Sequence, residues 1–285
     1  MSIKNKCENL LSDSLPGKLQ SGDSLSEKPQ TDEALLDDKP VLNILYQDEY
    51  LVAVDKPAGL FVHRSFMDND EKYFALQLVR DQVGRYVYPI HRLDRPTSGV
   101  LLFALNEDIA RELNRQFSER LVTKTYYALV RGFLEGSGIV DYALKEKLDK
   151  IGDKFADKDK PAQSAVTSYH SVAQAVLYEQ VGKFDTVRYS LVKLQPKTGR
   201  RHQIRRHLSH LRHPIIGDVN YGDNKQNPFF HRYFGFKRLM LIAKSLTFTH
   251  PVTQELITVE ADFDEQWCQF IGHVKWSLEE ILSSD

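Results

Sequence analysis

The sequence predicts an α+β fold around a mixed, mostly antiparallel sheet. Runs of β-branched and aromatic residues recur along the chain, and helical patterns fall between them without the regular strand–helix alternation of parallel α/β proteins. Of the 285 residues, 41% are hydrophobic, which is enough for a sizeable core. We see no internal repeat, and we expect one domain over 41–285.

Short β-rich runs bounded by turn residues predict the strands. They are expected at 41–46, 50–57, 99–105, 123–132, 165–177, 186–195, 239–249 and 256–261. The first two form a hairpin closed by Pro57 and Gly59. The run at 99–105 is continuously apolar, so it predicts a buried strand.

Helices are expected where apolar residues recur every three or four positions. The expected ranges are 71–84, 106–120, 198–211 and a closing helix from about 262. Gly84 marks the end of the first, and Asn106 is a typical N-cap for the second. Thr198 is a similar capping residue for the third.

The first forty residues differ from the rest. They hold five lysines and eight acidic residues, a charge of −3, which leaves +2 on the remainder of a chain whose total is −1. Their polar composition without sustained periodicity predicts a disordered tail over 1–40. The tail has no apolar core like that of a secretory signal, and no apolar run in the chain is long enough to span a membrane.

The chain has two cysteines, Cys7 and Cys268. So low a count suggests a reducing compartment and disfavours a thiolate metal site. We therefore expect a cytoplasmic protein.

The stretch HRLDRPTSG (91–99) contains the first candidate catalytic residue. Asp94 lies between Arg92 and Arg95, ahead of a turn of small residues. The two cations are expected to lower the pKa of this carboxyl group. An ionised carboxylate is a poor general acid but a usable nucleophile or base. The alternative is an aspartate that only caps a turn.

The second candidate site is the segment KTGRRHQIRRHLSHLRH (197–213), which has six Lys or Arg, four His and no acid. Its apolar residues are spaced to form one helical face, so its cations are expected to point outward. These cations are Arg201, His202, Arg205 and Arg206. Solvated faces usually mix signs, so we favour a surface that follows the phosphates of a nucleic acid over an ordinary charged face.

Three histidines in the same segment, at 207, 210 and 213, have a spacing that suggests a metal site. No carboxylate or cysteine joins them, so no metal is expected. Contacts to phosphates or bases, or a plain surface, explain them better.

Tyr126 and Tyr127 are neighbours in the expected strand 123–132. Successive side chains of a strand point to opposite faces, so one should enter the core and the other should not. A tyrosine beside a basic surface can stack on a nucleobase, although ordinary packing is the alternative.

Four stretches, in order, resemble the RluA family of pseudouridine synthases. They are DKPAG (55–59), HRLDRPTSG (91–99), KTYYALVRG (124–132) and TGRRHQIRRHL…RHPIIGD (198–218). The resemblance extends over about 41–264 and implies the pseudouridine synthase fold, with flanking helices and a central active-site cleft. The S4-type RNA-binding domain of many relatives is not recognised here.

Within this family the narrowest likeness is to enzymes that modify uridine 65 of tRNA. It is carried by Arg95-Pro96, by 152–167 and by 194–218. The resemblance implies a tRNA substrate modified in the acceptor stem, a monomer, and no cofactor or metal. A synthase acting on large-subunit rRNA is the alternative.

The resemblance also implies three catalytic residues. Asp94 aligns with the essential aspartate. Tyr126 aligns with the tyrosine that stacks against the target uracil and assists proton removal. Arg205 aligns with the basic residue that pairs with the aspartate.

Five further residues are expected to bind the substrate. Arg92 aligns with a residue that enters the space left by the flipped base, and Ile204 with one that lines the uracil pocket. The others, from the same motifs, are His91, Arg200 and His202.

The implied reaction explains an aspartate without a partner acid. The N1–C1′ bond of uridine breaks and C5 joins C1′, so no redox step or net hydrolysis occurs. Attack of the carboxylate at C6, attack at C1′ and proton abstraction leading to a glycal all stay open. The target base must leave its stack, which costs a few kcal/mol.

Three other classes of protein share some of these features. A glycoside hydrolase normally needs a second carboxyl group of raised pKa, and none is marked near Asp94 in sequence. A non-catalytic RNA-binding module explains the basic segment but not Asp94. A kinase is excluded because the HRLD spacing is wrong and no glycine-rich phosphate loop is present.

The charged insertion at 145–160, with six lysines and five acids, allows two interpretations. Its lysines, among them Lys154, Lys158 and Lys160, either contact the tRNA or belong to a solvated helix. The helix, packed through Leu148, Ile151 and Phe155, is favoured, with some lysines doing both.

Overall fold

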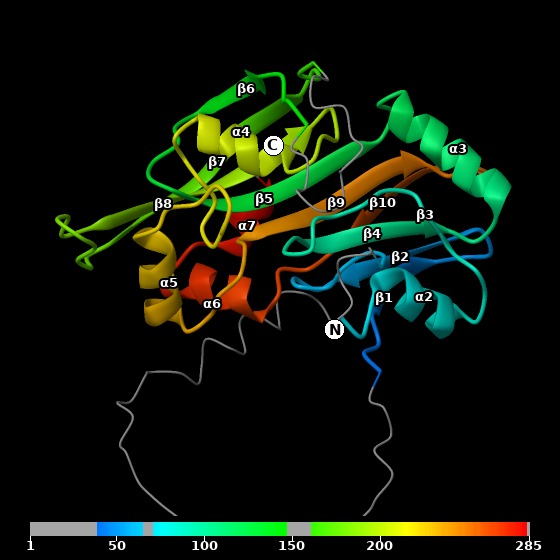
Figure 1. Cartoon of the computed structure of the whole chain (residues 1–285), viewed down its shortest axis with the longest axis horizontal. Coiled ribbons are helices and arrows are strands. Elements are labelled where there is room, and N and C mark those ends of the chain that lie inside the picture. The colour runs from blue at the N-terminus through cyan, green and yellow to red at the C-terminus, as the bar shows by residue number, and fades with distance from the viewer. Residues whose placement is uncertain (1–38, 65–70, 147–160, 284–285) are drawn as a thin grey trace, which may run out of the picture.

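A ten-stranded sheet organises the computed structural model, which describes residues 39–64, 71–146 and 161–283 (Figure 1). The strands are β1 (Asn43–Gln47), β2 (Leu51–Lys56), β3 (Tyr88–Pro89), β4 (Ser98–Ala104), β5 (Thr123–Arg131), β6 (Ser137–Asp141), β7 (Val166–Leu177), β8 (Val187–Pro196), β9 (Leu241–Thr249) and β10 (Leu256–Glu260). The helices are α2 (Ala75–Val83), α3 (Glu107–Ser118), α4 (Gln203–His210), α5 (Gln226–Phe234), α6 (Glu265–His273) and α7 (Leu278–Ser283).

The strand order is β1-β2-β4-β9-β5-β8-β7-β6, with β10 beside β9 and β3 beside β4. The pairing of β4 with β9 is parallel and the other strand pairs are antiparallel. The predicted mixed, mostly antiparallel sheet is therefore confirmed. Because β9 comes late in the chain and inserts between β4 and β5, it joins the N-terminal and C-terminal halves into one sheet.

The predicted strands and the second predicted helix are found close to their expected bounds. Asn106 caps α3 as expected, accepting a hydrogen bond from the backbone N–H of Ile109 at 2.9 Å. Helix α2 ends at Gly84, which has a φ of 70°. Elements β3, β6 and α5 were not predicted.

The third predicted helix begins later than expected. Helix α4 starts at Gln203, and Thr198 does not cap it. Instead the Thr198 hydroxyl donates to Oε1 of Gln203 at 2.6 Å and accepts from the N–H of Val166 at 3.0 Å. Thr198 therefore holds the turn that leads into α4 against β7.

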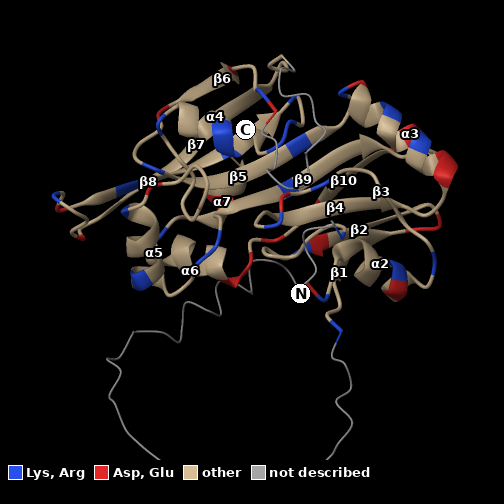
Figure 2. Cartoon of the chain, viewed as in Figure 1, with Lys and Arg blue, Asp and Glu red and all other residues tan. Residues whose placement is uncertain are grey.

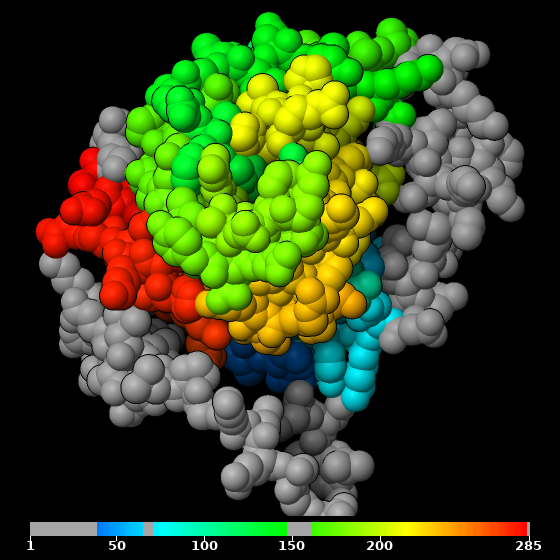
Figure 3. Space-filling view, turned by 90° about the vertical axis from the view of Figure 1, so that its left-hand side faces the viewer, coloured from blue at the N-terminus to red at the C-terminus, as the bar shows by residue number. Residues whose placement is uncertain are grey.

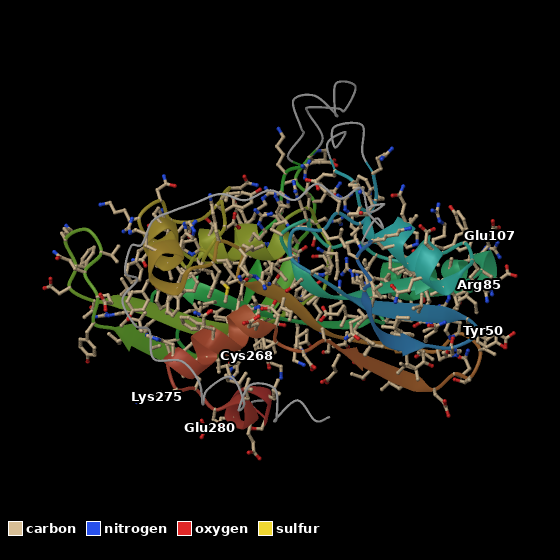
Figure 4. All side chains as sticks on the ribbon, turned by 90° about the horizontal axis from the view of Figure 1, so that it is seen from below. Tyr50, Arg85, Glu107, Cys268, Lys275 and Glu280 are labelled. Carbon is tan, nitrogen blue, oxygen red and sulfur yellow. The ribbon has the colours of Figure 1, made fainter. Side chains whose placement is uncertain are left out.

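Helices cover both faces of the sheet. Figure 4 shows α6 and α7, marked by Cys268 and Glu280, on one side and α4 on the other. On the first side, the ring of Tyr189 from β8 lies 5.9 Å from Phe230 of α5 and 5.8 Å from Phe270 of α6. In the space-filling view, the gold segment that includes α5 borders the lime-green β7–β8 end and meets the red C-terminal residues (Figure 3). This aromatic packing makes one face structural and leaves the α4 face for a site.

Gly99 permits the parallel contact between β4 and β9. It pairs with Ala243 and has a φ of 109°, in the region that favours glycine. A Cβ atom at this position would lie 2.2 Å from the carbonyl oxygen of Ala243. The glycine of HRLDRPTSG is thus needed to bring the segment before β4 against the centre of the sheet.

Two predicted features lie outside the described residues: the tail, apart from Lys39 and Pro40, and most of the 145–160 insertion, including Lys154, Lys158 and Lys160. In the part of the chain that the structure describes, no helix has the length and apolar character needed to cross a membrane.

Candidate active site

Asp94 lies in the segment between β3 and β4, near the centre of the sheet. Its backbone carbonyl accepts from the N–H of Thr97 at 3.0 Å, which closes a turn. The next carbonyl, that of Arg95, accepts from the N–H of Gly59 at 2.9 Å and from Nζ of Lys56 at 3.1 Å. The side chain of Asp94 is 22% exposed. A fixed backbone therefore presents a reachable carboxylate.

Lys56 is a buried lysine beside the Asp94 turn that sequence reasoning did not single out. It is fully buried, and besides the Arg95 carbonyl its Nζ donates to the carbonyls of Pro57 at 2.9 Å and Leu60 at 2.8 Å. Burial lowers the pKa of Lys56 to about 7, against the opposing effect of the Asp94 charge. The available signal was its place in DKPAG, where a lysine ties this loop to the one carrying Asp94.

Arg205 from α4 reaches Asp94 from the other side. Its Nη1 donates to Oδ2 of Asp94 at 3.3 Å, and its side chain is only 3% exposed. Its Nε and Nη2 donate to both carboxylate oxygens of Asp218 at 2.7 and 2.8 Å. Burial alone would lower the pKa of Arg205, but the two carboxylates raise it, so the guanidinium stays charged.

The outward position expected for Arg205 is thus wrong. The polar side of α4 near its start packs against the Asp218 segment, so it does not face solvent there. His207 is also fully buried, since its ring nitrogens contact the Thr167 hydroxyl at 2.9 Å and the Tyr142 carbonyl at 3.1 Å. The spacing of apolar residues in the sequence predicted the apolar face of α4. It could not predict which polar residues of the helix are buried by other parts of the fold.

The expected ion partners of Asp94 were also wrong. The side chain of Arg95 does not contact the Asp94 carboxylate. It pairs with Glu71, donates from Nε to the carbonyl of Gly59 at 2.9 Å, and its Cζ lies 4.4 Å from the ring centroid of Phe61. Arg92 is exposed. Among the described residues, the basic side chains within 4.0 Å of the Asp94 carboxylate are those of Arg205 and His202, and the guanidinium of Arg205 is the one that is charged. The charge that faces Asp94 comes from the fold and not from its sequence neighbours.

His202 stands at the entry to α4 beside the carboxylate. Its Nε2 is 3.9 Å from Oδ2 of Asp94, and its Nδ1 is 3.1 Å from the Tyr221 hydroxyl. Burial lowers the pKa of His202, with Asp94 opposing and Arg205 reinforcing the effect. Its φ of 53° is unusual for a residue with a side chain, and such strain is often held at functional sites.

Tyr126 and Tyr127 point to opposite faces of β5, as predicted. The Tyr127 hydroxyl donates to the carbonyl of Ile281 in α7 at 3.3 Å, within the aromatic core. Tyr126 lies on the α4 face. Burial, followed by the negative charge of Asp94, raises its pKa above the ordinary value. The phenol therefore stays protonated at neutral pH beside the carboxylate.

The other predicted binding residues have mixed surroundings. Ile204 is buried and joins the core beneath α4. Arg200 is exposed, with its Nε donating to the Ser164 carbonyl at 3.2 Å. His91 accepts at Nε2 from the N–H of Leu102 at 3.1 Å and stacks on Phe117, while burial lowers its pKa to about 4. The contacts of His91 stabilise the loop, and its role toward a substrate stays a prediction.

Two arginines, Arg205 and Arg206, lie on α4 itself, and Figure 2 shows them in blue. Arg201 is exposed just before the helix, and Arg206 donates from Nη1 to the carbonyl of Lys145 at 2.9 Å. In the described ranges, no group of three or more His, Cys, Asp or Glu is arranged to hold a metal ion.

The site therefore combines one reachable carboxylate, a buried guanidinium that pairs with it and a protonated tyrosine on β5. Exposed cations next to these groups suit a polyanionic substrate. A carboxylate held in this way can attack or stabilise an electron-poor carbon or remove a proton. Fold and site together define the class: an enzyme of the pseudouridine synthase type.

Comparison with known proteins agrees. The model of the RNA pseudouridylate synthase family matches residues 50–210. The chain belongs to this family, and is thus an isomerase that acts on uridine in RNA. The resemblance inferred from the four motifs is confirmed.

Similar proteins include "tRNA pseudouridine synthase C" of Vibrio cholerae, 53% identical over 244 residues that cover 86% of this chain and 100% of that protein. The protein of the same name from Pasteurella multocida is 55% identical over 240 residues, which cover 84% and 99% of the two chains. Among solved structures, "Human RNA Pseudouridylate Synthase Domain Containing 4" has a TM-score of 0.62 at 26% identity, over 83% of this chain and 94% of that one.

Proposed function

We propose that this enzyme converts one uridine of tRNA, at position 65, into pseudouridine. The observation that carries the proposal is the Asp94–Arg205 ion pair beside Tyr126. It supplies one ionised carboxylate, and isomerisation of uridine needs no second carboxyl group acting as a general acid. The names of similar proteins, all described as tRNA pseudouridine synthase C, support tRNA as the substrate. A tRNA substrate in turn supports the cytoplasm as the location.

In this proposal, Asp94 acts on C6 or C1′ of the flipped uridine, or removes a proton from the sugar. The N1–C1′ bond breaks, C5 bonds to C1′, the proton on C5 passes to solvent, and N1 gains a proton. Arg205 orients the carboxylate. Tyr126 stacks on the uracil and, since its hydroxyl is protonated, assists the loss of the C5 proton as a relay rather than as a strong base.

Arg92, exposed beside Asp94, is proposed to fill the space left by the flipped base. Ile204 lines the uracil pocket from α4. The remaining contacts to the RNA are assigned to His91, Arg200 and His202. A single domain over 41–285 that acts as a monomer completes the proposal.

The alternative function, hydrolysis of the same glycosidic bond, is disfavoured because the second carboxylate of the site is not available as an acid. Asp218, joined to Asp94 through Arg205, has a fully buried side chain. Although burial opposes it, the Arg205 hydrogen bonds and charge lower the pKa of Asp218. It is therefore unsuited to protonating a leaving group.

The test is site mapping without added cofactor. Wild-type protein and an Asp94→Asn variant are incubated with unmodified total tRNA and with large-subunit rRNA, and new pseudouridines are located by chemical labelling and primer extension. We expect one new pseudouridine, at tRNA position 65, with wild type and none with the variant, whose RNA affinity should stay within about twofold. Modification of rRNA alone would overturn the substrate, and release of free uracil would overturn the reaction.

A further inference from the structure

Lys124, at the start of β5, is a half-buried lysine whose charge has no carboxylate partner among the described residues. Other cations that the fold covers do have one: Arg205 pairs with Asp94 and Asp218, and Arg238 and Lys244 each pair with one acid. Holding a cation partly out of water without a counter-charge costs free energy. The folded protein therefore keeps a positive charge at Lys124 that a bound anion would stabilise.

The charges that shift the pKa of Lys124 are positive as well. Burial, followed by the charges of Lys197 and Arg120, lowers this pKa to about 8. Lys124 in turn adds to the effect of burial in lowering the pKa of His91. Lys197 follows β8 and Arg120 follows α3, and both are exposed. Separate segments of the chain thus bring basic groups together around one ammonium.

The ammonium of Lys124 also has few acceptors for its hydrogen bonds. In the part of the chain that the structure describes, Nζ contacts the carbonyl of Thr198 at 3.5 Å, the long limit of such a bond. An ammonium has three N–H donors. Lys56, which ties two loops together, uses them on three carbonyls at 2.8 to 3.1 Å. Lys124 is not fixed in that way, so it keeps donors for a ligand.

Lys124 lies between the segments that carry the candidate active site. It precedes Tyr126 by two residues on β5, so the two side chains leave the same face of the strand. Its Nζ reaches the Thr198 turn before α4, and its charge acts on His91, which begins the segment of Asp94. Residues two apart in a strand are about 6 to 7 Å apart. A phosphate next to a base stacked on Tyr126 therefore comes within reach of Lys124.

We propose that Lys124, Lys197 and Arg120 together bind one phosphate of the tRNA backbone next to the flipped uridine. The inference deepens the proposed function and rests on its assignment of Tyr126 to the uracil. A phosphate supplies both the negative charge and the acceptor oxygens that Lys124 does not receive from the described residues. Because this contact is the same before and during the reaction, its loss should raise KM and leave kcat nearly unchanged.

The experiment is a double-mutant cycle between Lys124→Met and single phosphates of the RNA. Unmodified tRNA is assembled from synthetic pieces in which a neutral methylphosphonate replaces one phosphate at a time around uridine 65. Each RNA is compared with one that has the ordinary phosphate and the same 2′-deoxyribose at that linkage. Filter binding at fixed salt measures the affinity of the full-length wild-type protein and of the variant.

With every phosphate present, we expect Lys124→Met to bind about tenfold more weakly than wild type. At one linkage, the methylphosphonate should weaken the wild type by about tenfold and the variant by less than about twofold. In turnover, KM of the variant should rise about tenfold while kcat changes less than about twofold. Additive losses at every linkage, or a wild type that tolerates every methylphosphonate, would overturn the proposal.

Lys244→Met is the matched control. Lys244 is also a lysine that the sheet covers, but its Nζ lies 3.5 Å from the carboxylate of Glu260 and 5.9 Å from the ring centroid of Phe263. Its substitution removes the same charge and also disturbs packing. It should leave the affinity for tRNA within about twofold of wild type and keep the full methylphosphonate effect, because it has no part in the phosphate site.

If Lys124→Met does not fold, Lys197→Ser takes its place, since Lys197 is exposed. This variant should lose most of the sensitivity to the methylphosphonate at the same linkage, and full sensitivity would overturn the proposal. Absence of pseudouridine in unsubstituted tRNA with wild type would instead contradict the proposed function. The phosphate contact is measured by binding alone, so the two failures are distinguishable.

Discussion

At the scale of single residues, Asp55 on β2 is a carboxyl group whose ionised form destabilises the folded state. It lines a cavity of about 380 Å³ together with Asp262, Asp264 and Arg238. Burial, followed by the charges of Asp264 and Asp262, raises the pKa of Asp55 to about 6. At neutral pH the carboxyl group is ionised in both the folded and the unfolded protein. Because its surroundings disfavour the charge only in the folded protein, the free energy of unfolding is reduced at this pH. That reduction becomes smaller as the pH drops below 6 and Asp55 takes up a proton in the folded state first.

We expect Asp55→Asn to stabilise the protein by about 1 to 2 kcal/mol at about pH 7.5, because the variant removes the charge that the cavity disfavours. The gain should shrink steadily between about pH 6 and pH 4, as the wild-type carboxyl takes up its proton. Denaturant unfolding of both proteins at several pH values measures it. Asp185→Asn, at an exposed position between β7 and β8, serves as the control and should show no pH-dependent gain. A gain at Asp55 that did not vary with pH would contradict the assignment.

At the residue scale, the sequence motifs indicated residues that lie close together in the structure, but they did not reveal the contacts that the fold adds. The motifs indicated Asp94, Tyr126 and Arg205, and the structure brings all three together. The same sequence placed Arg205 outward, because helical spacing cannot reveal that a buried carboxylate thirteen residues later covers the polar side of α4. Asp218 was quoted within a motif but carried no periodic or charge signal of its own.

At the scale of elements, the junction of β4 and β9 depends on Gly99. The close approach to Ala243 and the φ of 109° both exclude a side chain there. Because β4 follows the Asp94 turn directly, any movement of this junction also displaces the carboxylate. Backbone geometry and chemistry are thus linked within five residues.

We expect Gly99→Ala to lower the free energy of unfolding by about 3 kcal/mol, since the new methyl group meets a backbone carbonyl that cannot move freely. Gly84→Ala is the matched control. Gly84 also has a positive φ, of 70°, but a methyl group added there would meet no described atom within 4 Å. This control should cost only about 1 kcal/mol. Denaturant unfolding compares the two, and equal losses would show that the Ala243 contact does not matter.

The β1–β2 hairpin, α3 and the long strands could be predicted. Their residue spacing and, for α3, its N-cap residue Asn106 match the structure that they adopt. Helix α5 was missed although its aromatic residues at 229, 230, 233 and 234 recur at helical spacing and Gly235 ends it. Strand β6 could not have been found in this way. Its burial alternates, but the apolar Ile139 is on the exposed face at 71% exposure, so the sequence SGIVD shows no alternation of polar and apolar residues. The parallel β4–β9 pair was also unpredictable, because it joins segments that lie far apart in the sequence.

At the scale of the whole molecule, net charge conceals the distribution that matters. A total of −1 taken alone argues against a nucleic-acid partner. Yet seventeen residues around α4 carry six Lys or Arg and no acid, and they include both the catalytic candidate Arg205 and the exposed Arg200 and Arg201. Eight of the 39 acidic residues lie in the first forty residues, and others lie on or next to elements such as α3, where Glu112 and Glu119 pair with Arg115. A local cationic surface next to the site is therefore compatible with a nearly neutral protein.

This separation leads to a prediction about salt. If Arg200 and Arg201 neutralise RNA phosphates, changing both to Ser should weaken tRNA binding and make the slope of log affinity against log salt concentration shallower by about one to two, since each lost phosphate contact removes roughly 0.7 to 0.9. Filter binding of wild type and variant between low and moderate salt measures the slope.

The control for this experiment changes net charge by the same amount at two exposed positions outside the 197–213 segment. Arg232 lies on α5 and Lys275 follows α6, and Figure 4 shows Lys275 on the side of α6 and α7. Arg232→Ser with Lys275→Ser should leave the salt slope unchanged, because long-range effects are screened within about 10 Å at about 0.1 M salt. Equal changes in both variants would mean that overall charge, rather than the surface beside Asp94, governs the encounter with RNA. A changed slope in the first variant alone would place the phosphate backbone along the entry to α4, where Arg205 leads directly to the carboxylate.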